Sequence, residues 1–123
     1  MNSIEHFING KTVKGSSKRT GKVFNPATGE VSSNVNLANT TDLNKAVEAA
    51  KKAFPGWSEK TPLFRARVLF KFKELIEKNY DELTKIIVSE HGKVYEDAKG
   101  SLTRGLEVVE FACGIPVSYT HLR

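Results

Sequence analysis

Residues 40–54, TTDLNKAVEAAKKAF, mark the point where the hydrophobic pattern of this 123-residue chain changes from one typical of strands to one typical of helices. Apolar residues in this stretch lie three or four positions apart, at Leu43, Ala46, Val47 and Ala50. Thr40 or Thr41 is the expected N-cap, and Pro55 with Gly56 is expected to end the helix. We therefore expect strands before residue 40 and helices after it.

Two β-hairpins are expected before residue 40. In HFINGKTV (residues 6–13), Asn9-Gly10 separates two short runs, and both positions of such a turn favour a positive φ. In KVFNPATGEVSSNVNL (residues 22–37), a strand-like run leads to a turn over residues 25–29, and a second run with alternating apolar residues follows.

Three further helices are expected after the first. Thr61 is the predicted N-cap of the second helix, with Pro62 at its first position, where the missing N–H costs nothing. Asn79 and Glu82 resemble a capping box that opens the third helix, and Gly92 is expected to end it.

The fourth helix is predicted from about Val94 to Cys113, with Gly114 and Pro116 as its stop. The chain is thus assigned to the α/β class, as two β-hairpins followed by four helices. Two short polar hairpins are a poor partner for four amphipathic helices. We therefore expect apolar helix faces that this chain alone leaves exposed.

Composition limits the class of protein. Hydrophobic residues make up 39% and charged residues 27%, as in ordinary globular domains, and no apolar run approaches the ~20 residues that span a bilayer. The single cysteine cannot form an internal disulfide, and the N-terminus does not resemble a secretion signal. We expect a cytoplasmic protein, or one of the mitochondrial matrix. The net charge of the chain is +5, but its lysines and arginines are interspersed with glutamates, as in residues 71–85. This mixed pattern argues against nucleic-acid binding.

Common cofactor and metal motifs are not found. The segment GSSKRTGKV (residues 15–23) has five residues between its glycines, one more than a phosphate-binding loop, and G-x-G-x-x-G does not occur. The three histidines are too scattered for metal-ligand spacing. No metal site is predicted, and a nicotinamide site must be built otherwise or lie outside this chain.

Cys113 and Arg104 are the two residues whose chemistry invites a functional assignment. Cys113 lies at the predicted C-terminal end of a helix, where the negative end of the helix dipole does not favour a thiolate, so we assign it to packing. Arginine is suited to holding a carboxylate with its bidentate fork. From the helical pattern alone, however, Arg104 is expected to face solvent.

Several segments resemble the N-terminal part of the aldehyde dehydrogenase superfamily: FINGKTV (7–13), VFNPATGEV (23–31), IVSEHGKVYEDA (87–98) and RGLEVVEFACGIP (104–116). The last two look like the methylmalonate-semialdehyde dehydrogenase branch. The resemblance covers nearly all of this chain but only the opening portion of the family's longer chain. It implies that residues 1–116 are the N-terminal part of a Rossmann-like, NAD-binding domain.

The resemblance also implies an activity for the full-length protein. The family branch oxidises methylmalonate or malonate semialdehyde with NAD through a cysteine thioester, and coenzyme A then takes the acyl group to give propionyl- or acetyl-CoA. The catalytic cysteine, glutamate and asparagine would all lie beyond this sequence, as would the NAD loops. This chain alone would then be inactive, and its parent a homotetramer that binds neither nucleic acid nor membrane.

One residue role follows from the resemblance. In this branch an arginine on the corresponding helix is understood to grip the substrate carboxylate, and the pattern R-G-x-E-V-V-E-F places it at Arg104. Residues 117–123, VSYTHLR, do not match the family pattern and are interpreted as a foreign tail. Two alternatives remain: another aldehyde dehydrogenase subfamily, or a small non-enzymatic helical interaction module that closes around its own core.

Overall fold

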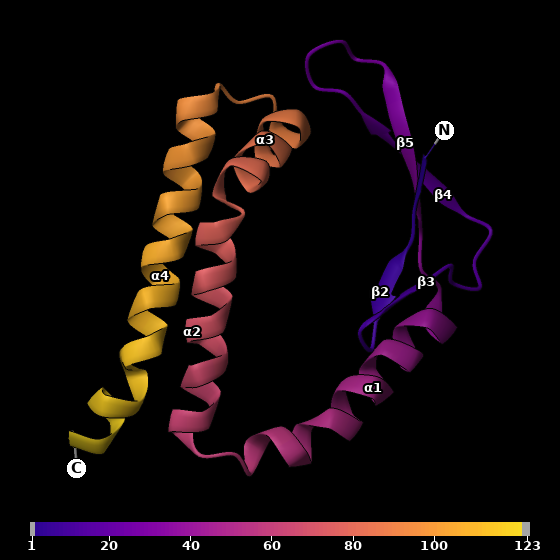
Figure 1. The fold of residues 1–123 in the computed structure, drawn as a ribbon. Coiled ribbons are helices and arrows are strands. Elements are labelled where there is room, and N and C mark those ends of the chain that lie inside the picture. The colour runs from indigo at the N-terminus through magenta and orange to yellow at the C-terminus, as the bar shows by residue number, and fades with distance from the viewer. Residues whose placement is uncertain (1, 122–123) are drawn as a thin grey trace. The chain divides into compact units, whose positions relative to one another are not determined.

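The computed structural model describes residues 2–121, with side chains described for residues 3–118. The chain forms two compact units, residues 1–59 and 60–123, each with its own internal packing. The first unit contains all the strands and one helix, and the second contains three helices (Figure 1).

The first unit has five strands and α1. Their bounds are β1 (Asn2–Ile4), β2 (His6–Ile8), β3 (Lys11–Val13), β4 (Thr20–Phe24), β5 (Val31–Asn36) and α1 (Thr40–Ser58). Strands β2 and β3 pair antiparallel by themselves, while β5 lies between β1 and β4 in a three-stranded sheet. Both predicted hairpins are confirmed. The parallel pairing of β1 with β5 was not predicted, because three residues at the chain start carry too little pattern.

Local chemistry explains both hairpin turns. Asn9 and Gly10 have φ values of 53° and 74°, as a two-residue primed turn requires. In the second hairpin, the side chain of Asn25 accepts a hydrogen bond from the Ala27 amide at 2.8 Å, and the Asn25 carbonyl accepts one from the Gly29 amide at 2.8 Å. The turn residues named from the sequence therefore form these turns.

The N-cap of α1 is Asn39, so the prediction of Thr40 or Thr41 is wrong by one or two positions. The Asn39 side chain accepts from the Asp42 amide at 3.0 Å, and the Asp42 carboxylate accepts from the Asn39 amide at 3.3 Å. This reciprocal pair satisfies two otherwise free N–H groups. Thr40 and Thr41 lie inside the helix and cannot form this reciprocal pair.

The predicted end of α1 is also wrong, because the helix passes Pro55 and ends at Ser58. Proline loses its own N–H bond to the preceding turn and its ring crowds that turn, but the turn after it can still form. Its carbonyl still accepts hydrogen bonds from the Glu59 amide at 3.1 Å and the Ser58 hydroxyl at 2.9 Å. The following turn is therefore completed.

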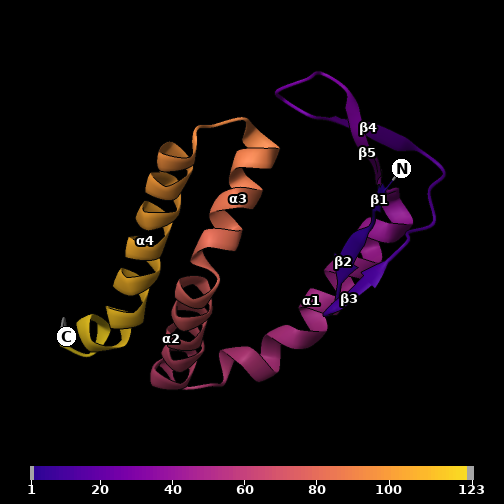
Figure 2. The ribbon, with the colours of Figure 1, turned by 45° about the horizontal axis from the view of Figure 1, so that its top comes forward.

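The second unit consists of α2 (Pro62–Lys78), α3 (Tyr80–His91) and α4 (Tyr95–His121). Helix α4 packs along α2 and α3 (Figure 2).

The Thr61 cap is confirmed by its hydrogen bond from the Phe64 amide, and Gly92 closes α3 at φ 76° as predicted. The capping box at Asn79 is wrong: its side chain makes no cap bond to α3 and donates instead to the Leu75 carbonyl at 2.7 Å, closing α2.

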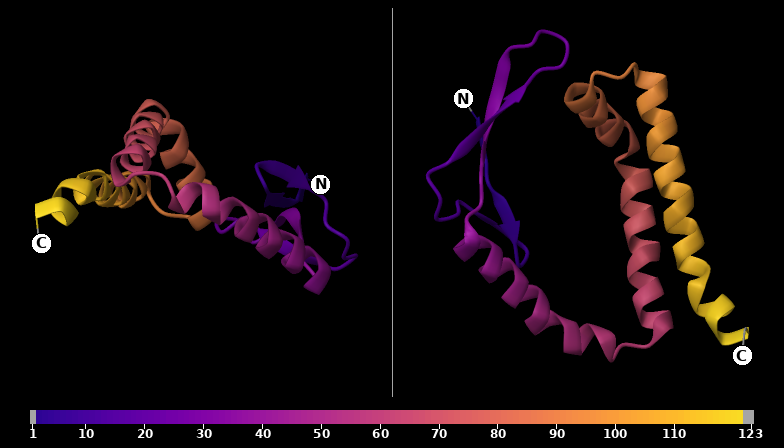
Figure 3. Two further views of the ribbon diagram at one scale, coloured as in Figure 1. Left: turned by 90° about the horizontal axis from the view of Figure 1, so that it is seen from below. Right: turned by 180° about the vertical axis from the view of Figure 1, so that it is seen from behind.

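Helix α4 does not stop at Gly114 and Pro116, as the sequence predicted. It continues to His121 with Pro116 inside it, and its axis bends in the last turns (Figure 3). A proline bends a helix because its ring clashes with the preceding turn, but the turns on either side can still form. The predicted foreign tail therefore continues α4 as far as it is described, and residues 122 and 123 lie outside the described residues.

Few side chains are fully buried. Among the described residues the buried apolar ones are small: Ala66, Ala98 and Cys113, all in the second unit. Larger apolar side chains remain exposed, for example Phe54 at 66% and Phe111 at 76%. The expectation of exposed apolar helix faces is confirmed. No helix among the described residues has the length and apolar character needed to cross a membrane.

Candidate functional site

Arg104 lies on the face of α4 that points away from the packed interior of the second unit. Cys113 is 6% exposed and marks the packed face, and nine residues separate it from Arg104. At 3.6 residues per turn, nine residues place two side chains on opposite faces of a helix. Arg104 is accordingly exposed, as the helical pattern predicted.

The guanidinium group of Arg104 lies back along α4, over Gly100. A Cβ atom built on Gly100 would be 4.0 Å from Arg104 Nη1. This direction is the usual one, because side chains on a helix point toward its N-terminus. No ion pair of Arg104 is found within the part of the chain that the structure describes. Its fork of N–H donors is therefore available to an external carboxylate.

Polar contacts fix the segment of α4 that carries Gly100 and Arg104. The Tyr80 hydroxyl, at the start of α3, donates to the Lys99 carbonyl at 2.9 Å and hydrogen-bonds with the Thr103 hydroxyl. Lys93 Nζ donates to the Ser101 hydroxyl at 2.9 Å. The sequence pattern gave no signal for these contacts, which depend on how α3 and α4 pack.

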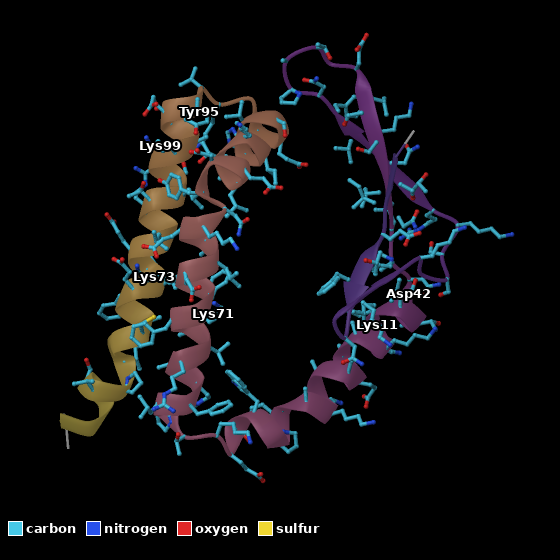
Figure 4. All side chains as sticks on the ribbon, viewed as in Figure 1. Lys11, Asp42, Lys71, Lys73, Tyr95 and Lys99 are labelled. Carbon is cyan, nitrogen blue, oxygen red and sulfur yellow. The ribbon has the colours of Figure 1, made fainter. Side chains whose placement is uncertain are left out.

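Tyr95 and Lys73 hold α4 to the other two helices (Figure 4). The Tyr95 hydroxyl donates to Asp81 at 3.0 Å, and this hydrogen bond is the main reason that the pKa of Tyr95 is raised. Lys73 on α2 pairs with Glu77 and, at 3.3 Å, with Glu110 on α4. The hydrogen bond to Glu77 is the main cause that raises the pKa of Lys73. These contacts make α4 a fixed support for Arg104.

Cys113 is buried and free, in agreement with the packing role predicted for it. It lies within α4 rather than at its end, because the helix continues past Pro116. Activated thiolates are partly exposed and lie near a cation, a histidine or a helix N-terminus. The buried position of Cys113 differs from that setting.

A second polar cluster lies in the first unit, around Asp42 at the start of α1 (Figure 4). Asp42 is 3% exposed and accepts hydrogen bonds from the Ser16 amide and hydroxyl, both at 2.9 Å. Burial would raise the pKa of Asp42, but the bonds from Ser16 and Asn39 and the nearby His6 outweigh it and lower the pKa. The cluster joins α1 to the loop before β4.

The described residues do not form a metal centre or a dinucleotide loop. They contain no group of three or more His, Cys, Asp or Glu side chains that could hold a metal ion. Gly15 lies in the connection between strands β3 and β4, and Gly21 lies within β4, whereas phosphate loops lead from a strand into a helix. The segment that carries these two glycines therefore does not have the strand-to-helix arrangement of a phosphate loop.

One hollow lies between α2 and α3, with a volume of about 370 Å³. Its lining is mostly apolar and consists of Phe72, Leu75, Ile76, Asn79, Glu82, Leu83 and Ile86. Arg104 is not part of this lining, so the candidate carboxylate site and this groove are separate features of the second unit.

Comparison with known proteins identifies the family. The model of the aldehyde dehydrogenase family matches residues 12–121. The chain belongs to the aldehyde dehydrogenase family. Its mixed α/β fold matches the N-terminal part of aldehyde dehydrogenase structures, as the sequence resemblance implied. The family match extends past residue 116, and the boundary placed there stays a prediction.

Individual members of the family differ in how similar they are to this chain. The malonate-semialdehyde dehydrogenase of Pseudomonas aeruginosa is 47% identical over 94% of this chain and 23% of its own length. A Sinorhizobium meliloti structure, assigned as a methylmalonate-semialdehyde dehydrogenase and complexed with NAD, is 52% identical over 94% of this chain and 24% of its own, with a TM-score of 0.90. An NAD-dependent benzaldehyde dehydrogenase from Corynebacterium glutamicum is 26% identical over 94% of this chain and 25% of its own, with a TM-score of 0.85. The chain thus spans about a quarter of the length of these relatives.

Proposed function

We propose that this chain is the N-terminal quarter of an NAD-dependent, CoA-acylating dehydrogenase of malonate or methylmalonate semialdehyde. The supporting observation is the contrast in sequence identity. Relatives named for these semialdehydes are about twice as similar to the chain as the benzaldehyde dehydrogenase, although the folds superimpose almost equally well. The excess similarity therefore reflects more than the shared fold.

The proposed reaction converts malonate semialdehyde, coenzyme A and NAD⁺ to acetyl-CoA, carbon dioxide and NADH. The methyl-substituted substrate gives propionyl-CoA in the same way. The thioester-forming cysteine, the general base and the NAD loops would belong to the remaining three quarters of the protein. This chain alone would then be inactive, and the parent enzyme would be a homotetramer, as the family resemblance implies.

Arg104 is the residue of this chain that we assign to the substrate. Both semialdehydes carry a carboxylate, and a guanidinium fork can bind it with two parallel, charge-assisted hydrogen bonds. Three features support the assignment: the exposure of Arg104, its lack of an ion pair among the described residues, and the fixed position of the helix beneath it.

The test uses the full-length dehydrogenase, expressed from the complete reading frame that encodes this chain. Hydrogen bonds to charged groups contribute about 1.5–3 kcal/mol, so Arg104→Leu should lower kcat/KM for malonate semialdehyde by roughly 10- to 100-fold. Propanal has no carboxylate, and its kcat/KM should change by less than about threefold, equivalent to under about 0.7 kcal/mol.

Arg67→Leu, at an exposed position on α2, is the matched control and should leave both values unchanged. Equal losses for the two aldehydes in Arg104→Leu would remove Arg104 from the substrate site.

A further inference from the structure

Residues 14–19, the strap, connect β3 to β4 and lie against the start of α1. The Ser16 amide and hydroxyl both donate to Asp42 Oδ1 at 2.9 Å. The Arg19 side chain donates to the Ala38 carbonyl at 3.4 Å. The strap is therefore attached to the start of the helix by hydrogen bonds from both of its ends.

Gly15 is the residue of the strap whose conformation requires glycine. Its φ is 78°, a value that residues with a side chain rarely adopt. A Cβ atom built on Gly15 would lie 2.8 Å from both Cδ2 and Nε2 of His6 on β2, and 3.3 Å from Asp42 Oδ2. Carbon atoms in favourable contact are about 3.5–4.0 Å apart, so a side chain at this position would overlap with the imidazole.

The His6 imidazole occupies the space that a side chain on Gly15 would need. Its Nε2 atom is buried and has no hydrogen-bond partner among the described residues. The backbone of His6 is paired with Val13 on β3, which limits how far the ring can be moved by a shift of the strand. The overlap could therefore be relieved only if the ring left its packed position, and Asp42 Oδ2 would still lie close to the new Cβ atom.

We propose that the strap fastens the β2–β3 hairpin to the start of α1, and that it can close only because residue 15 has no side chain. The bare backbone of Gly15 lets the His6 ring approach while Ser16 reaches Asp42. An open strap would deprive the buried Asp42 carboxylate of both donors from Ser16, which is unfavourable for a buried charge. The proposal concerns the first unit and does not depend on the proposed reaction.

The experiment measures amide hydrogen exchange by mass spectrometry in the full-length dehydrogenase, in peptides that contain the Ser16 amide. Gly15→Ala should open the strap and speed this exchange by roughly tenfold. Gly29→Ala is the matched control, because Gly29 has a φ of 73° but a Cβ atom built on it has no neighbour within 4 Å. It adds the same backbone strain without the overlap and should change exchange in the strap by less than about twofold.

A His6→Ala background separates the overlap from the backbone strain at position 15. Alanine lacks the ring atoms that the new Cβ would meet, so Gly15→Ala should speed exchange less in this background than in the wild-type protein. If Gly15→Ala folds only in the His6→Ala background, that result supports the proposal in the same way.

Three results would overturn the proposal. Strap exchange could be no faster in Gly15→Ala than in Gly29→Ala, Gly15→Ala could have an equal effect in both backgrounds, or it could prevent folding in both. Each would mean that contact with His6 is not the reason that residue 15 must be glycine.

Discussion

Asp42 is a buried charged residue that joins segments distant in the sequence. Its carboxylate accepts from Ser16 in the loop before β4 and from Asn39 at the start of α1. Because these bonds favour the charged form, the pKa of Asp42 is lower in the folded chain than the usual value of 3.8. The stability that this provides is present above pH 4 to 5 and is lost as pH falls through the lowered pKa.

Asp42→Asn should therefore lower the urea midpoint of the first unit at pH 6 and should flatten its dependence on pH between 6 and 3. Trp57 in α1 is the only tryptophan of the chain, so its fluorescence can follow the unfolding of this unit. Asp97→Asn, at an exposed position of α4, is the control. If the Asp42→Asn variant kept the wild-type pH dependence, Asp42 would not be the group whose protonation lowers the stability of the first unit at low pH.

Residue identity alone could predict some of these roles and not others. Thr61 and Gly92 were predicted correctly, because a single cap former stands at each boundary. At the start of α1, Asn39, Thr40 and Thr41 are all good cap formers, and only the reciprocal bond with Asp42 distinguishes them. The position of Arg104 opposite Cys113 could be predicted from the helical period, whereas its placement over Gly100 required the structure.

Helices α1 and α4 each extend past a proline that the sequence pattern treats as a stop. Pro55 lies in the last turn of α1, and Pro116 is followed by five more residues of α4. Local signals predicted the existence and order of all four helices. They could not predict these ends, because a helix continues beyond a proline where hydrogen bonds on both sides of it can form.

Pro116→Ala should stabilise the second unit. A proline inside a helix costs up to about 3 kcal/mol, so its replacement should raise the melting temperature and increase the helical circular dichroism signal. Pro62→Ala is the matched control: Pro62 occupies the first position of α2, where proline is tolerated, and its replacement should change the melting temperature little. A lower melting temperature for Pro116→Ala would mean that α4 ends before residue 116.

Across the described residues of the chain, the buried apolar side chains are few and small. Three small apolar residues are buried among the described residues, while large apolar side chains on α1, α2 and α4 remain exposed. This distribution does not favour a small interaction module closed around its own core. It fits a segment whose apolar faces are covered by the remaining chain of a protein about four times as long.

The isolated 123-residue chain should therefore bind a hydrophobic dye such as ANS strongly, and the full-length dehydrogenase should bind much less per molecule. The isolated chain should also reduce no NAD⁺ when supplied with malonate semialdehyde and coenzyme A. A compact chain with weak dye binding and a sharp, high-temperature unfolding transition would contradict this description.

Product analysis of the full-length enzyme distinguishes a CoA-acylating semialdehyde dehydrogenase from other aldehyde dehydrogenases. Malonate semialdehyde should yield acetyl-CoA and NADH in equal amounts, and turnover should require coenzyme A. Its kcat/KM should exceed that for propanal by about tenfold or more, the equivalent of about 1.4 kcal/mol. Formation of malonate with no requirement for coenzyme A, or equal kcat/KM for the two aldehydes, would contradict the proposed function.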